Sequence, residues 1–550
     1  MSSQPLAMQA IGLATLFSVM AYSYVKLYHR RFKQHPLLPR LPASLVWGHL
    51  QVFDSFVKQG KLDRHNDMVF SDIHKQLGRP PLFYLDFWPI QYGIVIVCDP
   101  EVAEQLSKVS KKFPCSAPKA PIADRMGDLI GPRTIMCKQG EDWKATRKRF
   151  NPGFAPSHLM TLLPFILDKT TRFLEFLDHF AQSEETFTLD DLTTNLTFEI
   201  IGAIVMEEDM NAQHLDLSRQ SEMAILFKEL VKTFADDKFH LPWWLSPVVA
   251  RRRRHLGNRI SQLLKDIIRR RFQNFKTANK ASSKLRTVLS LALQDTEHLT
   301  PDLLDDTCDQ LKSFLFAGHD TTSNLICWSI YELSRTPHAL RAVCSELETL
   351  FGKEVANNPH LIREKLLSAE GPELMSRMVY ISAVIKEVLR LYPPAASTRL
   401  AKPGSGLEVS ATGNKVCLDG LLIIINHYII QRDERLFGET ANDFVPERWL
   451  DIKDKHNDDK FVAGAWRPFE TGPRNCIGQE LSNIEARVII AMVACRYDFT
   501  KVGLGEPALD DSGRPILDDK HQFKVKSELY PTLQITAKPI DGMRMKIKLR

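Results

Sequence analysis

The residues that could perform the most demanding chemistry in this chain surround one cysteine. Residues 469–478 read Phe-Glu-Thr-Gly-Pro-Arg-Asn-Cys-Ile-Gly, and Gly472 and Gly478 permit tight backbone turns on either side of Cys476. A helical pattern begins directly after this loop, at Gln479. The positive end of a helix favours the thiolate form of cysteine, which is the form that binds metals. The loop therefore predicts a metal-binding thiolate, although a lone cysteine is more often a buried apolar side chain.

A second polar cluster lies inside a long apolar helical pattern that runs from about 303 to 335. Its residues are Gly318-His319-Asp320-Thr321-Thr322. Glycine weakens a helix, and Asp and Thr compete for its backbone hydrogen bonds, so the cluster predicts an opening in the helix. A kink with solvent-facing polar groups is the alternative. We expect His319 to be a packing residue, as a lone helical histidine usually is.

Two Glu-x-x-Arg pairs place opposite charges on one helix face. Glu387 and Arg390 precede a Pro-Pro stop, and Arg448 in the segment Pro-Glu-Arg-Trp is a candidate third member. The other pair, Glu332 and Arg335, has neither feature, so we expect it to be an exposed ion pair that contributes little.

A basic helical segment holds Trp143 and Arg147 one turn apart. Both side chains can therefore face one anionic group, for which the guanidinium fork is well suited. Lys144 and Lys148 fit a solvated helix face or a surface that receives an acidic partner.

The loop around Cys476 resembles the F-x-x-G-x-R-x-C-x-G signature of the haem-binding loop in cytochrome P450 enzymes. The other three motifs follow in that family's order, and the resemblance covers residues 36–550. Trp449 stands where the family more often has Phe. The resemblance implies a mainly α fold with small β-sheets, haem b as cofactor, and Cys476 as the axial ligand of its iron.

The resemblance also implies a role for each motif. Thr321 would hydrogen-bond dioxygen at the iron, and Asp320 would feed the proton relay. A buried structural network would consist of Glu387, Arg390 and Arg448. The haem-binding residues would be Trp143, Arg147, Arg399, Phe469, Arg474, Cys476 and Gly478. The substrate pocket would include Phe314, Phe316, Ala317, Ala396 and Ser397, with parts of 115–135 and 530–533.

The elements that position these groups follow an apolar N-terminus. Residues 1–25 carry no charge, and the run from Leu6 to Val25 is long enough to span a bilayer. Basic residues follow it rather than precede it, which indicates an uncleaved signal anchor with the remaining chain in the cytosol. A buried helix of a soluble protein is the alternative. We expect one transmembrane helix at 1–25, a basic and Pro-rich linker at 26–45, and a haem domain at 46–550.

The rest of the chain predicts one large, mainly helical domain. Residues 80–98 have the pattern of a β-hairpin, and about 140–400 is mostly helical. Strand-like runs return at 416–425 and at 533–549, where Pro-Ile-Asp-Gly at 539–542 predicts a hairpin turn.

Composition excludes several classes of protein. The net charge of +6 is too small for this length to indicate a nucleic-acid partner. The nine cysteines include no C-x-x-C pair, which excludes a zinc ribbon and a dense disulfide framework. A G-x-G-x-x-G dinucleotide motif after a strand is also absent from the sequence, so electrons must come from another protein.

By resemblance, the chain is predicted to be a monooxygenase of the endoplasmic reticulum membrane, an EC 1.14 oxidoreductase. It would insert one atom of O2 into a lipophilic small molecule by hydroxylation, epoxidation or oxidative coupling, as fungal microsomal members do in secondary metabolism. Electrons would come from NADPH through a separate NADPH–cytochrome P450 reductase, with cytochrome b5 as a second candidate donor. The alternatives are a fatty-acid or xenobiotic hydroxylase, a reductase-independent haem-thiolate isomerase or dehydratase, and a non-enzymatic haem-binding membrane protein. The loop 242–247 fits a bilayer contact or ordinary packing equally well.

Overall fold

The structure, a computed structural model, describes residues 4–235, 246–277, 286–411, 413–450, 464–532 and 534–550. Most of these residues are helical, as predicted. The helices of ten residues or more are α1 (Gln4–Tyr28), α2 (Leu50–Gln59), α3 (Asn66–Gln76), α6 (Gly140–Phe150), α8 (Leu163–Ser183), α9 (Leu189–Met206), α10 (Glu222–Ala235), α11 (Pro247–Thr277), α13 (Pro301–Arg335), α14 (Pro337–Phe351), α17 (Val379–Leu391) and α21 (Gln479–Ala494). The shorter ones are α4 (Pro100–Ser107), α5 (Ala123–Ile130), α7 (Pro156–Thr161), α12 (Val288–Ala292), α15 (His360–Leu367), α16 (Gly371–Arg377), α18 (His427–Ile430) and α19 (Glu434–Phe437).

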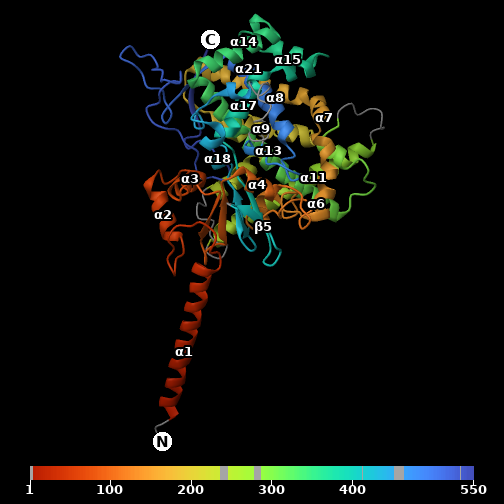
Figure 1. Cartoon of the computed structure of the whole chain (residues 1–550). Coiled ribbons are helices and arrows are strands. Elements are labelled where there is room, and N and C mark those ends of the chain that lie inside the picture. Colours follow the sequence, from red (N-terminus) through yellow and green to blue (C-terminus); the bar gives the residue numbers. More distant parts are fainter. Residues whose placement is uncertain (1–3, 236–245, 278–285, 412, 451–463, 533) are drawn as a thin grey trace.

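A four-stranded sheet lies near the C-terminal end of α1, where that helix meets the rest of the molecule (Figure 1), and its strand order is β1-β2-β7-β4. Its strands are β1 (Leu82–Asp86), β2 (Gly93–Val97), β7 (Leu422–Ile425) and β4 (Ser397–Leu400). The predicted hairpin at 80–98 is confirmed, since β1 and β2 pair antiparallel. All ten residues of β1 and β2 are buried, which explains their apolar, β-branched composition. Antiparallel pairing with β7 fixes β4, and therefore Arg399.

The C-terminal hairpin is not formed as predicted. The strand β9 (Arg544–Leu549) lies between β8 (Tyr497–Lys501) and β3 (Phe187–Thr188), pairing antiparallel with both. The turn at 539–542 does form, with Gly542 N donating to Pro539 O at 3.1 Å. The described residues before that turn form isolated bridges, Pro531 with Pro539 and Thr532 with Arg64, rather than a strand that pairs with β9. Thus β9 takes distant partners, which local alternation cannot identify. The run at 416–425 is likewise divided, because β6 (Asn414–Cys417) pairs with β5 (Glu408–Ala411) in a sheet of two strands.

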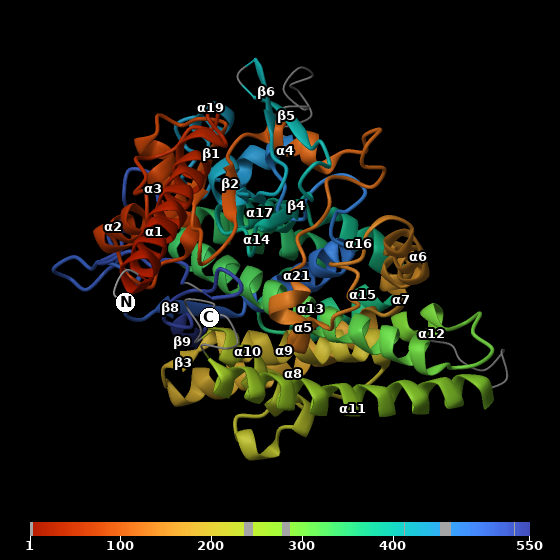
Figure 2. The same ribbon diagram turned by 90° about the horizontal axis from the view of Figure 1, so that it is seen from below.

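The long helix α13 passes through the core. In Figure 2, α8, α9 and α11 lie on one side of α13, while β1, β2 and α3 lie on the other. A Cβ added to Gly318 would lie 2.9 Å from side-chain atoms of Ile201 on α9, so this glycine permits the two helices to approach closely.

The second Glu-x-x-Arg pair is not the exposed pair that the sequence predicted. Glu332 is only 2% exposed, and its Oε1 accepts a 2.6 Å hydrogen bond from Tyr392 Oη. The ring of Tyr392 is stacked on Trp328 at 3.8 Å, and Arg335 donates to Gln522 Oε1 at 2.8 Å. Both motifs of this type therefore join α13 or α17 to other parts of the core.

The N-terminal helix projects from the molecule (Figure 1). It continues beyond Tyr28 as a π-helix, His29–Lys33, so the described helix runs past the predicted boundary at residue 25. Among the described residues, one helical segment, Ile11–Lys33, has the length and hydropathy to cross a membrane, and none of its apolar stretch is buried in the protein.

Candidate active site

The loop before α21 holds Cys476 in a tight turn. Cys476 N donates to Phe469 O at 2.9 Å, and Asn475 N donates to Gly472 O at 3.2 Å. Gly472 has a φ of 75°, and a Cβ there would lie 2.3 Å from the carbonyl oxygen of Ser107. Any side chain at 472 would therefore displace the loop, whereas Gly478 leaves ordinary space beside the Cys476 sulfur. The helix starts at Gln479, as predicted.

Cys476 is exposed, as is Cys417, whereas Cys137 and Cys344 are partly buried and the other five cysteines are buried. Crowding by protein atoms raises the pKa of the Cys476 thiol, although the N–H groups of Gly478 and Gln479 and the charges of Arg147 and Lys119 lower it. The helix terminus therefore lowers the pKa of this thiol, in the direction that the sequence predicted, but crowding outweighs it. A bound metal cation would ionise the thiol, because coordination removes its proton.

Cationic side chains gather beside Cys476. Arg399 is fully buried, and its Nε and Nη1 have no hydrogen-bond partner. The nearby Lys119 donates to Ser397 Oγ at 2.8 Å, and burial together with Arg399 lowers its pKa to about 7. The guanidinium of Arg474 lies over the ring of Trp143 at 4.7 Å, and burial and Arg399 lower its pKa to about 10. These cations repel one another, and too few carboxylates lie beside them to balance their charge. The site therefore favours the binding of a dianion.

Arg147 also lies at this site, as predicted, but its protein partner is the cysteine loop. Its Nη1 donates to Asn475 O at 2.9 Å and its Nη2 to Asn475 Oδ1 at 3.1 Å. It therefore connects α6 to the residue before Cys476, while Trp143 is 7% exposed under Arg474.

A buried carboxylate behind the loop supports these cations. Glu470 accepts from Arg467 Nη2 at 2.6 Å and faces Arg399 Nη2 at 3.4 Å. Burial alone would raise the pKa of Glu470. The charges of Arg467, His427 and Arg399 outweigh burial and lower this pKa to about 2. Sequence analysis missed Arg467, Glu470 and Lys119 as site residues. Only Glu470 had a local signal, because it directly follows Phe469 in the motif.

The helix α13 is continuous from 301 to 335, so it has no break at its polar cluster and the predicted opening is absent. Instead, hydroxyl groups bond the carbonyl oxygens: Thr321 Oγ1 donates to Ala317 O at 2.7 Å, and Thr197 Oγ1 donates to His319 O at 2.9 Å. His319 is a packing residue, as predicted. It is 4% exposed and lies edge-on to Phe198 and Phe227.

Both carboxylate oxygens of Asp320 have partners in the C-terminal segment. Oδ2 accepts from Thr536 Oγ1 at 2.6 Å, and Oδ1 lies 3.1 Å from Lys538 Nζ. The same Nζ lies 3.0 Å from Oδ1 of Asp190 on α9. Burial would raise the pKa of Asp320, but the charge of Lys538 holds this pKa below its usual value. At Asp190 burial outweighs the same lysine, and the pKa is raised. Sequence analysis missed Asp190 and Lys538, since neither lies in a recognisable motif.

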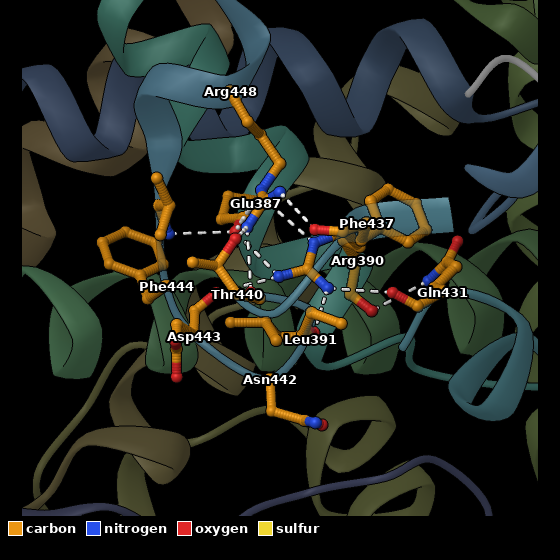
Figure 3. Close-up of polar contacts among 12 residues, drawn as sticks. Glu387, Arg390, Leu391, Gln431, Phe437, Thr440, Asn442, Asp443, Phe444 and Arg448 are labelled. Carbon is orange, nitrogen blue, oxygen red and sulfur yellow. Dashed lines mark hydrogen bonds and ion pairs between the residues drawn. The ribbon is translucent and has the colours of Figure 1, made fainter. Parts of the chain in front are cut away.

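The predicted structural network exists (Figure 3). Arg390 Nη2 donates to Glu387 Oε1 at 2.8 Å, and Arg448 Nε donates to the same oxygen at 3.0 Å. Trp449 Nε1 donates to Glu387 Oε2 at 2.9 Å, a bond that Phe could not make. Arg390 Nε donates to Glu387 Oε2 at 2.9 Å, and its other bonds go to backbone carbonyls, including those of Gln431 and Asp443. Glu387 and Arg390 are fully buried, and the charge of each is compensated.

The predicted pocket residues divide into two groups. Ala317 is partly exposed and lies one turn before Thr321 on α13, and Ala396 is partly exposed before Ser397 of β4. Phe314 instead packs edge-on against Phe150 and Phe154, and Phe316 against His319. The described contacts of both aromatic rings are thus core contacts, and a substrate-facing role for them stays a prediction.

Comparisons with known proteins agree with this geometry. The sequence model of the cytochrome P450 family matches residues 39–526. The chain belongs to the cytochrome P450 family. It is 30% identical over 508 residues to cytochrome P450 monooxygenase acrF of Aspergillus aculeatus, covering 88% of this chain and 97% of that protein. It is 28% identical over 514 residues to cytochrome P450 monooxygenase polC of Polytolypa hystricis, covering 89% and 87%. It is also 26% identical over 496 residues to a bifunctional cytochrome P450/NADPH–P450 reductase of Gibberella moniliformis, covering 88% of this chain and 39% of that longer protein.

The site residues of this P450 monooxygenase fit a haem. An accessible thiol at Cys476 is a suitable ligand for iron, and the unpaired donors of Arg399 suit the two carboxylates that haem carries. Lys119 and Arg474 lie close enough to Arg399 to feel its charge, so they are candidates for the same carboxylate site, and the roles of Arg147 and Trp143 there stay predictions.

Proposed function

We propose that this P450 oxidises a lipophilic small molecule of fungal secondary metabolism, by hydroxylation, epoxidation or oxidative coupling. The observation that carries the proposal is the combination of the Cys476 loop with the buried Arg399 beside it, two nitrogens of which have no hydrogen-bond partner. The named monooxygenases acrF and polC, both fungal, support the biological setting. When bound, haem supplies the activation of O2, which amino-acid side chains cannot provide.

The protein's own contribution is to bind, orient and supply protons. Cys476 holds the cofactor through sulfur, and the Arg399 group holds its carboxylates. The Thr321 hydroxyl donates its proton to Ala317 O in this structure, and it would donate to oxygen after turning away from that carbonyl. The Asp320 carboxylate is ionised and paired with Lys538, and it would feed protons towards the oxygen site. The Asp320–Thr321 pair favours a monooxygenase over a haem-thiolate isomerase or dehydratase, in which oxygen takes no part.

Electrons would come from NADPH through a separate reductase, with cytochrome b5 as a second candidate. In the Gibberella moniliformis relative, a P450 and a reductase are named in one chain. Lys144 and Lys148 on α6 lie in a shallow surface hollow with Trp143 and Arg147, which offers positive charge to an acidic partner.

The N-terminal helix would anchor the enzyme in the endoplasmic reticulum membrane, with the haem domain in the cytosol. The apolar composition, length and exposure of the helix support the anchor. The basic residues after its apolar run support the cytosolic position of the haem domain. Most of the loop 242–247 lies outside the described residues, so its proposed lipid contact rests on sequence alone.

The test is metabolite profiling of the source organism with and without the gene, followed by reconstitution with a reductase and NADPH. A compound that accumulates without the gene should be consumed by the reconstituted enzyme, with oxygen uptake. Thr321→Ala should raise peroxide release per NADPH oxidised, and Thr321→Ser should restore the wild-type ratio. Turnover that consumes neither NADPH nor oxygen would support an isomerase instead.

A further inference from the structure

The last turn of the N-terminal helix is built into the haem domain through one arginine. Arg31 is 1% exposed, and its Nη1 forms a 2.5 Å ion pair with Asp86 Oδ2 at the end of β1. Its Nη2 donates to Val46 O at 2.8 Å and to Trp88 O at 2.7 Å, and its Nε donates to Leu45 O at 3.1 Å. A buried charge with this many partners fixes the geometry around it, because loss of any partner leaves the charge unsatisfied.

The fit around Arg31 leaves little room for movement. Gly48 has a φ of 58°, and a Cβ there would lie 2.4 Å from Asp86 O and 2.5 Å from Arg31 Nη1. Arg40 donates to Arg31 O at 2.9 Å and so satisfies one of the free carbonyls at the helix end. Residues 26–45 were predicted to be a basic and Pro-rich linker, but the segment is bound to the domain through Arg31 and through Pro39 O, which accepts from Tyr84 N at 2.8 Å.

Arg31 also brings together two loops that expose large apolar side chains. One loop carries Val46 and Trp47, which are 56% and 50% exposed. The other joins β1 to β2 and carries Trp88, Ile90 and Tyr92, which are 39%, 56% and 54% exposed. Because Val46 and Trp88 bind the same nitrogen of Arg31, the two loops are adjacent. We refer to these five residues as the anchor patch.

The length of the helix determines the depth of the patch in a bilayer. Arg31 lies six positions after Val25, the end of the apolar run, which is about 9 Å along a helix. Each headgroup layer is about 5–8 Å thick, so Arg31 would lie at its outer edge, with the adjoining patch facing the headgroups. Trp and Tyr are favoured at this depth, and Arg30, whose guanidinium lies 5.0 Å from the Trp88 ring, can pair with phosphate there.

We propose that Arg31 and Asp86 clamp the anchor helix to the haem domain, so that the anchor patch forms a second contact with the lipid headgroups. A bilayer is favoured over a protein as occupant because the patch is continuous with the anchor and shares its basic border. The inference rests on the proposed membrane anchoring of α1, and it is independent of the proposed substrate.

The test uses the full chain in phosphatidylcholine vesicles that contain lipids brominated close to the headgroup, which quench nearby tryptophans. Comparison with Trp47→Phe isolates the signal of Trp47. We expect that signal to be quenched in the wild-type background and at least twofold less quenched in Asp86→Asn. The matched control is Asp54→Asn, which removes an exposed ion pair with Lys58 and should leave the quenching unchanged.

Flotation with vesicles and the haem spectrum separate the alternative outcomes. Every variant should float, because α1 is unaltered, and should bind haem, because Asp86 is outside the haem site. Absence of Trp47 quenching in floating wild-type protein would overturn the lipid contact. Equal quenching in Asp86→Asn would overturn the clamp. Shielding of Trp47 that rises with the protein-to-lipid ratio would indicate a second copy as occupant, and wild-type protein that does not float would refute the anchor itself.

Discussion

Lys538 Nζ lies 3.1 Å from Asp320 Oδ1 and 3.0 Å from Asp190 Oδ1, so one cation of the C-terminal segment balances two carboxylates on α13 and α9. Thr194 Oγ1 accepts a third bond from Lys538 at 3.2 Å. The side chains of Asp190, Lys538 and Asp320 become progressively more buried, at 18%, 10% and 3% exposure. The polar cluster of α13 is thereby connected to the more exposed Asp190 on α9 and to the C-terminal segment that carries Lys538.

Lys538→Met should leave two buried carboxylates without a cation and destabilise the fold by about 3–5 kcal/mol. Because their pKa values would then exceed those of the unfolded chain, the variant should lose further stability as the pH rises from 5 to 7. Wild-type protein should lose less over this range, since Lys538 keeps Asp320 ionised and only the pKa of Asp190 is raised. Urea unfolding at both pH values measures this. Lys538→Arg should recover part of the loss, and Lys548→Met, at an exposed pair with Glu184, should have little effect.

Trp449→Phe should destabilise the protein by about 1–2 kcal/mol, although Phe is the commoner residue of the family at this place. The reason is the lost hydrogen bond to the buried, ionised Glu387. Trp466→Phe is the matched control, because its Nε1 bonds only a neutral carbonyl, Lys386 O, at 3.0 Å. Equal losses for the two variants would show that the charge of Glu387 is not what Trp449 stabilises.

His427 should make the protein sensitive to mild acid. Burial lowers its pKa to about 4, from a usual value of 6.5. Between these values the unfolded chain binds a proton that the native state excludes, so stability is full above pH 6.5 and falls as the pH drops towards 4. The expected loss at pH 5 is about 2 kcal/mol. His427→Gln should show a correspondingly smaller change in urea midpoint between pH 7 and 5, whereas His360→Gln, on an exposed site, should behave as wild type.

Arg399→Met should weaken haem retention, because it removes the two buried donors that have no protein partner. Transfer of haem to apomyoglobin gives the dissociation rate without any need for turnover. We expect an increase of at least tenfold, with a smaller increase for Lys119→Met. An unchanged rate for both would mean that this cation group does not bind the haem carboxylates.

The sequence predicted the site where chemistry and spacing are local. The Cys476 loop and the Glu387 network each combine a short motif with a helix boundary, and both are assembled as expected. Arg147 instead binds Asn475 in the cysteine loop, so its contact with an anion stays a prediction. Arg448 could be added only through the family resemblance, since its partner lies 61 residues away.

What escaped prediction depends on tertiary contact. Lys538 and Lys119 lie in segments without regular pattern, and only the fold brings them to Asp320 and Arg399. Glu332 was misjudged because sequence spacing does not report burial. The hairpin at the C-terminus was misjudged because β9 pairs with β8, whose residues precede it by more than 40 positions.

The measurement that tests the account most directly is the absorption spectrum of the reduced, purified full chain under carbon monoxide, in wild type and Cys476→Ala. Thiolate ligation predicts a strongly red-shifted Soret band in the wild type and its complete loss in the variant. A wild-type spectrum without that band, or a Cys476→Ala variant that retains it, would contradict the assignment of Cys476 as the iron ligand.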